Sequence, residues 1–237
     1  MTAPAVAFVA GATGYTGRAV VDALVERGVR TVAHVRPDSP RRAEWTERWQ
    51  SRGAEADATP WDEAALTRTL RTLRPTVVLA LLGTTRARAR REGKGAVEGY
   101  EAIDHGLTMM LLSAARACGS GPRFVYLSAA GLSEGTRNPY MRVRVRVEQA
   151  LREGELPYTI ARPSFITGSE RDESRLGERV GAVVADGLLG LAGMLGGRTL
   201  RDRYQSMTNV ELAAGLVRVA LDPGFENRVA EGEDLRG

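Results

Sequence analysis

The sequence is poor in cysteine, histidine and lysine, and each scarcity narrows what the protein can be. The single cysteine, Cys118, excludes an internal disulfide, and we therefore expect a cytoplasmic location. The two histidines, His34 and His105, form no recognisable metal site with it, so we expect no metal. Lys94 is the only lysine among 33 basic residues. This arginine bias accompanies much alanine and indicates a GC-rich genome rather than nucleic-acid binding.

Long apolar runs are also missing. The longest apolar-rich stretch, residues 180–195, is interrupted by Asp186 and several glycines and is too short to cross a bilayer. The N-terminus has no basic segment ahead of its apolar residues, so we expect no signal peptide. The partner we expect is a small-molecule substrate, with no nucleic acid and no membrane, for a monomer or homodimer. A length of 237 residues suits one α/β domain.

Apolar β-type runs alternate with helical patterns along the first two thirds of the chain. The predicted strands cover residues 6–10, 31–35, 76–82, 123–127 and 158–161. The predicted helices cover residues 14–26, 40–50, 62–73, 97–117 and 139–152. This alternation predicts an α/β fold of the Rossmann type, with a doubly wound parallel sheet.

The pattern changes after Pro163. We therefore divide the single domain into a nucleotide-binding core, residues 1–162, and a small C-terminal substrate-side lobe, residues 163–237. In the lobe, we expect a capped helix that ends before Asp222 and a short strand near 228–230 that could close the sheet.

The most specific local signal is the glycine segment VAFVAGATGYTGRAVVDALVERG, residues 6–28. Gly11, Gly14 and Gly17 follow an apolar strand directly and open an amphipathic helix. Glycines permit the tight turn and a close approach of the backbone to a pyrophosphate, which the helix N-terminus attracts. In this context the pattern predicts dinucleotide binding.

The end of the second strand predicts which dinucleotide is bound. An acidic residue there binds a ribose hydroxyl, whereas an arginine accommodates a 2′-phosphate. Arg36 occupies this position, and Asp38 follows where a turn or helix cap is expected. We therefore expect NADP (NADPH), with Arg18, Arg41 and Arg42 as possible additions to the phosphate site.

The stretch YMRVRVRVE allows two interpretations. Its valines and arginines alternate with period two, which is typical of a half-buried strand. Tyr140, Arg144 and Glu148 are also spaced by four, which on a helix aligns them along one side. A helix would gather Val143 and Val147 into a separate core stripe, and the sequence shows no turn that would end a strand. We expect the helix.

Three further motifs accompany the glycine segment: LLGTTRARA, YMRVRVRVEQAL after FVYLSAAG, and RPSFITGSERDESRLGE. Together they resemble an atypical short-chain dehydrogenase/reductase of the NmrA-like kind, closest to the Tat-interacting-protein oxidoreductase branch. The resemblance covers almost the whole chain and is weakest between residues 40 and 75. In that family the segment at Tyr140 is the catalytic helix and carries Tyr-x-x-x-Lys, which agrees with the helical interpretation.

The resemblance implies a site, residue by residue. The cofactor-binding residues would be Gly11, Thr13, Gly14, Tyr15, Thr16, Gly17, Arg18, Arg36, Leu82, Gly83, Tyr140, Arg144, Ile166 and Arg175. Arg36 would meet the 2′-phosphate, Ile166 the nicotinamide, and Arg175 would lie near the cofactor or in a closing loop. The catalytic residues would be Tyr140, Arg144 and Ser128.

The chemistry that fits these residues is carbonyl reduction. Tyr140 would protonate the oxygen and Ser128 would polarise the carbonyl, while a cation steadies the phenolate. Arg144 stands where the family has lysine, and arginine cannot lose a proton. This departure indicates either neutral drift or a lost or redirected activity.

The expected function is an NADP-dependent oxidoreductase acting on a small or medium hydrophobic carbonyl or alcohol. The alternatives are an NADP(H)-binding regulatory protein without turnover and a non-redox isomerase or cyclase. Two features stay open: Asp104 and His105 either face the site or lie on the helix surface, and the basic loop 84–95 either binds an anion or is solvated.

Overall fold

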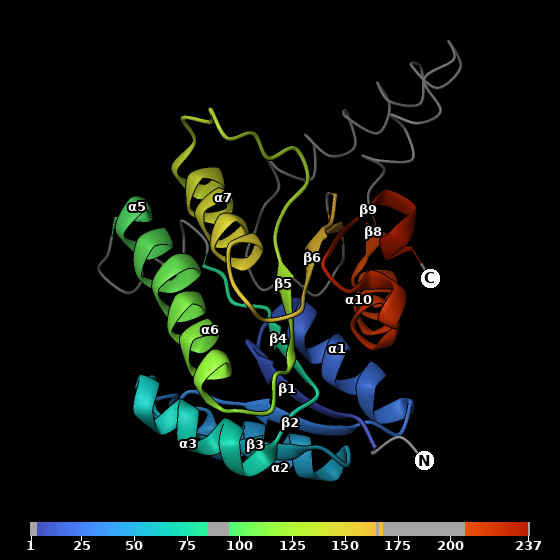
Figure 1. Cartoon of the computed structure of the whole chain (residues 1–237). Coiled ribbons are helices and arrows are strands. Elements are labelled where there is room, and N and C mark those ends of the chain that lie inside the picture. Colours follow the sequence, from blue (N-terminus) through green and yellow to red (C-terminus); the bar gives the residue numbers. More distant parts are fainter. Residues whose placement is uncertain (1–3, 85–94, 165, 168–206, 237) are drawn as a thin grey trace.

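The computed structural model describes residues 4–84, 95–164, 166–167 and 207–236. Its main sheet has seven strands in the order β3-β2-β1-β4-β5-β6-β9, and every adjacent pair is parallel (Figure 1). The strands are β1 Val6–Ala10, β2 Arg30–His34, β3 Glu55–Asp57, β4 Val77–Ala80, β5 Arg123–Leu127, β6 Tyr158–Arg162 and β9 Arg228–Glu231. The expected Rossmann-type α/β fold is confirmed. The strand order reverses between β1 and β4, and ligands of such sheets bind at the carboxyl ends of the strands there.

Helices cover both faces of this sheet (Figure 1). One face packs against α1 (Tyr15–Glu26), α2 (Arg42–Ser51) and α10 (Asn209–Leu221). The other packs against α3 (Glu63–Leu73), α6 (Thr108–Ala117) and α7 (Pro139–Arg152). The α6 helix continues from α5 (Ala96–Gly99) through the π-helical segment η1 (Tyr100–Leu107). Because both faces are covered, successive strand residues such as Phe8 and Val9 are fully buried, which explains the continuous apolar runs.

The predicted elements match the structure within a few residues at each end. The first and fourth predicted strands coincide with β1 and β5, and all five predicted helices are present. The strand β3 was missed because it has only three residues and no apolar run. It extends the sheet at the edge beyond β2.

The C-terminal elements join the core. Thr208 caps α10 in a reciprocal capping box with Glu211, and β9 pairs in parallel with β6. Both features were expected. Two short strands, β7 (Ile166–Thr167) and β8 (Met207–Thr208), form a separate pair, and the 3₁₀ turns η2 (Pro223–Phe225) and η3 (Gly232–Leu235) flank β9. The division of the domain at residue 162 stays a prediction, since residues 168–206 lie outside the described residues.

Candidate functional site

The glycine turn between β1 and α1 is shaped by the absence of side chains. Gly11 adopts a left-handed φ of +85°, and a Cβ there would lie 2.5 Å from the Leu81 carbonyl oxygen. A Cβ at Gly17 would overlap the Gly11 carbonyl. Gly14 is the N-cap of α1 and contributes no side chain to its open N–H groups. This cradle fits a dinucleotide pyrophosphate, because backbone N–H groups can approach it closely at the positive end of the helix.

Other residues expected at the pyrophosphate surround this turn. Thr13, Tyr15 and Arg18 are half-buried, and Thr16 is buried. The Tyr15 carbonyl accepts a hydrogen bond of 3.0 Å from the Asn209 side chain, which ties the start of α10 to the turn. Sequence reasoning missed Asn209, since nothing in its local pattern reports a partner 194 residues away.

Arg36 lies just beyond the end of β2, as expected. Its side chain is 41% exposed, and its Nε lies 3.7 Å from the Asp38 carboxylate. Arg41 is engaged with Glu44, and Arg42 donates to the Pro37 carbonyl at 3.3 Å. Arg36 and Asp38 therefore offer one cation and one carboxylate at the position that distinguishes the two dinucleotides.

The turn after β4 connects the glycine turn to the helix α7. Its Leu81 backbone contacts Gly11. Two residues later, a Cβ on Gly83 would lie 3.5 Å from Asp104 Oδ1 and 3.6 Å from Arg144 Nη2. Leu82 is buried beside them. The segments expected to hold pyrophosphate, ribose and substrate thus adjoin one another at the carboxyl ends of the strands.

The segment from Tyr140 onward is helical. Asn138 caps α7 by accepting from the Tyr140 N–H at 3.0 Å, and proline follows at the first helical position. Val143 and Val147 are buried, at 1% and 0% exposure, whereas the alternating arginines Arg142 and Arg146 are exposed. The helical prediction is confirmed, and the period-two alternation does not reflect a strand.

Arg144 is buried and surrounded by protein groups. Its Nη1 donates to the Leu127 carbonyl at 2.7 Å and to the Tyr126 hydroxyl at 3.3 Å. Its Nη2 donates to Asp104 Oδ1 at 3.1 Å, and its guanidinium carbon lies 4.4 Å from the Tyr140 ring centroid. Burial would lower the pKa of Arg144, but the two tyrosines and Asp104 raise it overall, so the cation is retained. The half-buried Tyr140 therefore stacks on a fixed positive charge.

Asp104 faces the site, which settles one of the open alternatives. It is fully buried, and its Oδ2 accepts from the Thr84 N–H at 2.9 Å. Burial raises the pKa of Asp104 to about 6, although Arg144 and the Thr84 N–H act to lower it. His105 points instead to Arg146 on the surface. The two residues are neighbours in η1, and Asp104 lies on its buried side with Thr108, one turn further along.

Ser128 is engaged away from Tyr140. Its hydroxyl donates to Glu148 Oε1 at 2.6 Å. Burial would raise the pKa of Glu148, but hydrogen bonds from Arg162 and Ser128 lower it overall, with further help from Arg152. The carboxylate is therefore charged and joins α7 to β5 and β6. The expected role of Ser128 at a substrate carbonyl stays a prediction, and it would require the hydroxyl to leave Glu148.

Four expectations fall at or beyond the limits of the described residues. Ile166 lies in the short strand β7. Arg175 and the apolar stretch 180–195 lie outside the described residues, as does most of the basic loop 84–95.

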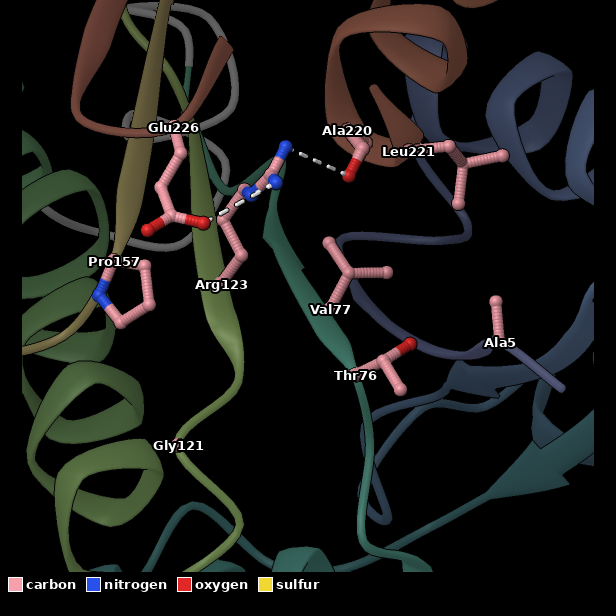
Figure 2. Close-up of a pocket in the computed structure, with 9 residues that line it drawn as sticks. All are labelled: Ala5, Thr76, Val77, Gly121, Arg123, Pro157, Ala220, Leu221 and Glu226. Carbon is pink, nitrogen blue, oxygen red and sulfur yellow. Dashed lines mark hydrogen bonds and ion pairs between the residues drawn. The ribbon is translucent and has the colours of Figure 1, made fainter. Parts of the chain in front are cut away.

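A hollow of about 280 Å³ lies at the amino ends of β4 and β5, at the other end of the strands from the glycine turn (Figure 2). Arg123 lines it and donates to the Asp222 carbonyl at 2.6 Å. It also donates to the Ala220 carbonyl at 3.4 Å, and its Nη2 lies 3.5 Å from Glu226 (Figure 2). Because ligands of parallel sheets bind at the carboxyl ends of the strands, this hollow is not the candidate site. Arg123 instead caps the end of α10.

Comparison with known protein families bears directly on the glycine turn. A family described as NAD(P)H-binding matches residues 11–186, from the first glycine of the turn onward. The chain belongs to this NAD(P)H-binding family. Dinucleotide binding, inferred from the glycine segment, is thereby supported at the level of NAD(P)H.

Two curated relatives of this NAD(P)H-binding protein come from fungi. The "Protein FMP52, mitochondrial" of Coccidioides immitis is 28% identical over 68% of this chain and 64% of its own length. The "Protein fmp52-1, mitochondrial" of Aspergillus terreus is 34% identical over 43% of this chain and 41% of its own length. The matches thus span less than two thirds of either relative. Both are named as mitochondrial proteins, so the expected cytoplasmic location is wrong.

Solved structures share the fold. A UDP-glucose 4-epimerase from Bifidobacterium longum, in complex with NAD⁺ and UDP, has a TM-score of 0.67 at 17% identity, covering 95% of this chain and 77% of its own. AtPrR2 with NADP⁺ and (+)pinoresinol has a TM-score of 0.67 at 15% identity, covering 97% and 70%. At these identities the likeness concerns the fold alone. None of the helices within the described residues combines the length and apolar character that crossing a bilayer requires.

Proposed function

We propose that the chain is an NADP-dependent oxidoreductase of the atypical short-chain dehydrogenase type, within the NmrA-like group. Its substrate would be a small or medium hydrophobic carbonyl or alcohol. The observation that supports this most directly is the stacking of Tyr140 on the Arg144 guanidinium, 4.4 Å from the ring centroid and beside the Gly83 turn. A phenol that stacks on a buried cation is suited to proton transfer. This phenol lies at the carboxyl ends of the strands, as the glycine turn does.

The chain's own residues divide the work as follows. When bound, the nicotinamide cofactor exchanges the hydride. The Tyr140 hydroxyl donates its proton to the carbonyl oxygen, and the Arg144 charge offsets the negative charge left on the phenol oxygen. Arg144 acts as a fixed charge and not as a proton relay, because a guanidinium does not deprotonate in proteins. Ser128 would polarise the carbonyl by hydrogen bonding once its hydroxyl turns from Glu148 to the substrate.

A paired substitution tests the acid. Tyr140→Phe should leave NADPH affinity within about two-fold while turnover falls by roughly 10²–10⁴, the usual cost of losing a general acid. The matched control is Tyr100→Phe, whose ring meets Tyr140 edge-on at 5.4 Å but is given no role in proton transfer. NADPH oxidation across a panel of hydrophobic carbonyl compounds supplies the measurement. Parental turnover in Tyr140→Phe would refute the proposed mechanism.

Arg36 supports the choice of NADP. Arg36→Ala should weaken NADP binding by about 10–100-fold, the range of a lost charge-assisted contact, and leave NAD affinity nearly unchanged. Asp38→Asn should strengthen NADP binding, because Asp38 competes with a 2′-phosphate for Arg36. Arg27→Ala, an exposed arginine at the far end of α1, is the control. Calorimetry that gives equal affinities for the two cofactors in the parent would contradict the choice.

A regulatory protein that binds NADP(H) without turnover is the second candidate. It is favoured by the hydrogen bonds that the Arg144 Nη1 and Nη2 atoms and the Ser128 hydroxyl already make to protein groups. This candidate predicts NADPH binding by calorimetry together with no oxidation of NADPH by any compound in the panel. Turnover that depends on Tyr140 would exclude it.

A further inference from the structure

One helix carries two carboxylates that pair with two arginines of α7. Glu101 binds Arg146 at 2.9 Å on the surface, where the two side chains are 40% and 46% exposed. Asp104 binds Arg144 at 3.1 Å in the interior, where the side chains are 0% and 6% exposed. The two pairs have the same chemistry and differ in burial. The surface pair contributes little to the free energy of unfolding. The interior pair loses the hydration of two charges, and this desolvation can cost more than their attraction returns.

The interior carboxylate also holds a second segment. Its Oδ1 accepts from Arg144, and its Oδ2 accepts from the Thr84 N–H in the turn after β4. A single side chain thus joins the catalytic helix to the turn that contacts the glycine segment. Asp104 lies within η1, and π-helical turns inside α-helices often occur at functional sites.

Burying Asp104 and Arg144 together carries a cost in free energy. Burial raises the pKa of Asp104 to about 6, so keeping it charged at neutral pH works against folding. The Arg144 Nε and the Thr84 hydroxyl are buried with no hydrogen-bond partner among the described residues. Buried pairs of this kind are often replaced by apolar residues at no loss of stability. A buried pair that is retained at this cost, in contact with Tyr140, indicates a functional constraint.

We propose that Asp104 is a positioning residue: it holds the Arg144 guanidinium flat against the Tyr140 ring and keeps the Gly83–Thr84 turn in register with it. The inference rests on the proposed function, since it assigns Asp104 a part in the reaction at Tyr140. Asp104 does not touch the reacting atoms and acts through Arg144 and the turn. The charged and titratable groups around it are Arg144 and Tyr140 from α7 and Tyr126 from β5.

The test compares Asp104→Asn with Glu101→Gln, the same chemical change on the surface pair of the same helix. Asp104→Asn keeps an acceptor for Thr84 but removes the charge that fixes Arg144. It should weaken NADPH binding by about three- to ten-fold in calorimetry and lower turnover by up to about 100-fold, as expected for a misplaced catalytic group. Its melting temperature at pH 8 should equal or exceed that of the parent. Glu101→Gln should leave all three quantities unchanged.

A pH profile separates positioning from mere structural support. In the parent, kcat/KM should fall as pH drops through about 6, because a protonated Asp104 no longer holds Arg144. Asp104→Asn should lack this acid limb. The inference is overturned if the variant keeps parental NADPH affinity and turnover, or if its only effect is a lower melting temperature.

The proposed function can fail separately from this inference. Parental turnover in Tyr140→Phe refutes the function without reference to Asp104. If no carbonyl compound is turned over, NADPH affinity decides: weaker binding in Asp104→Asn than in Glu101→Gln supports the positioning of the turn, and equal binding refutes it.

Discussion

Lysine is the residue that NmrA-like short-chain dehydrogenases carry at the position of Arg144. We nevertheless expect Arg144→Lys to destabilise this protein. The guanidinium reaches three acceptors at once: the Leu127 carbonyl at 2.7 Å, Asp104 at 3.1 Å and the Tyr126 hydroxyl at 3.3 Å. It does so with a planar fork whose face also covers Tyr140. A lysine ammonium is a single point and cannot reproduce this geometry.

The magnitude follows from what lysine leaves unpaired. At least one buried acceptor loses its donor, which costs about 1–3 kcal/mol. The stacking of the cation on Tyr140 is worth about 0.5–2 kcal/mol. Removal of the unpartnered Nε offsets part of the loss, so we expect a net decrease of about 2–4 kcal/mol in the free energy of unfolding. In a domain of this size that corresponds to a fall of about 5–15 °C in melting temperature.

The control is the same substitution two residues away. Arg146 forms an exposed pair with Glu101, so Arg146→Lys should change stability by less than about 0.5 kcal/mol. Urea unfolding of both variants at pH 7.5 measures the difference. Equal stability of the two variants would refute the argument, and would mean that Arg144 is an interchangeable cation left by genomic drift.

Two further outcomes follow from the described contacts. Gly17→Ala should abolish NADPH binding and lower stability by about 1–3 kcal/mol, because its Cβ would overlap the Gly11 carbonyl; Gly135→Ala, with nothing within 4 Å, is the control for both measurements. Asp104 has a folded-state pKa of about 6 against about 3.9 in an unfolded chain, so between these values the unfolded state binds fewer protons. The free energy of unfolding should therefore fall by up to about 3 kcal/mol as pH rises from 4 to 7, and urea unfolding should find this fall reduced in Asp104→Asn; identical pH dependence in the two proteins would contradict the assignment.

Local patterns in the sequence were sufficient for most of the fold. The glycine turn, six of the seven strands of the main sheet and the helix α7 were predicted because each depends on neighbours within a few residues: apolar runs, capping residues, or backbone that only glycine can adopt. The short strand β3 was missed because its formation depends on pairing with β2, not on its own composition. Thr208 and Glu211 gave an equally local signal for α10.

The contacts that define the candidate site depended on tertiary structure. The sequence placed Tyr140 and Arg144 on one helical side but left the partner of the arginine open. That partner, Asp104, lies 40 residues earlier and faces inward on the helical segment that leads into α6. The bond from the Ser128 hydroxyl to Glu148 was likewise not visible in the sequence, and the role of Ser128 at a substrate stays a prediction. Spacing along a chain determines which residues share a face of a helix or strand. The pairing of buried donors and acceptors depends on how separate elements pack, because a buried charge needs a partner and that partner can belong to a distant element.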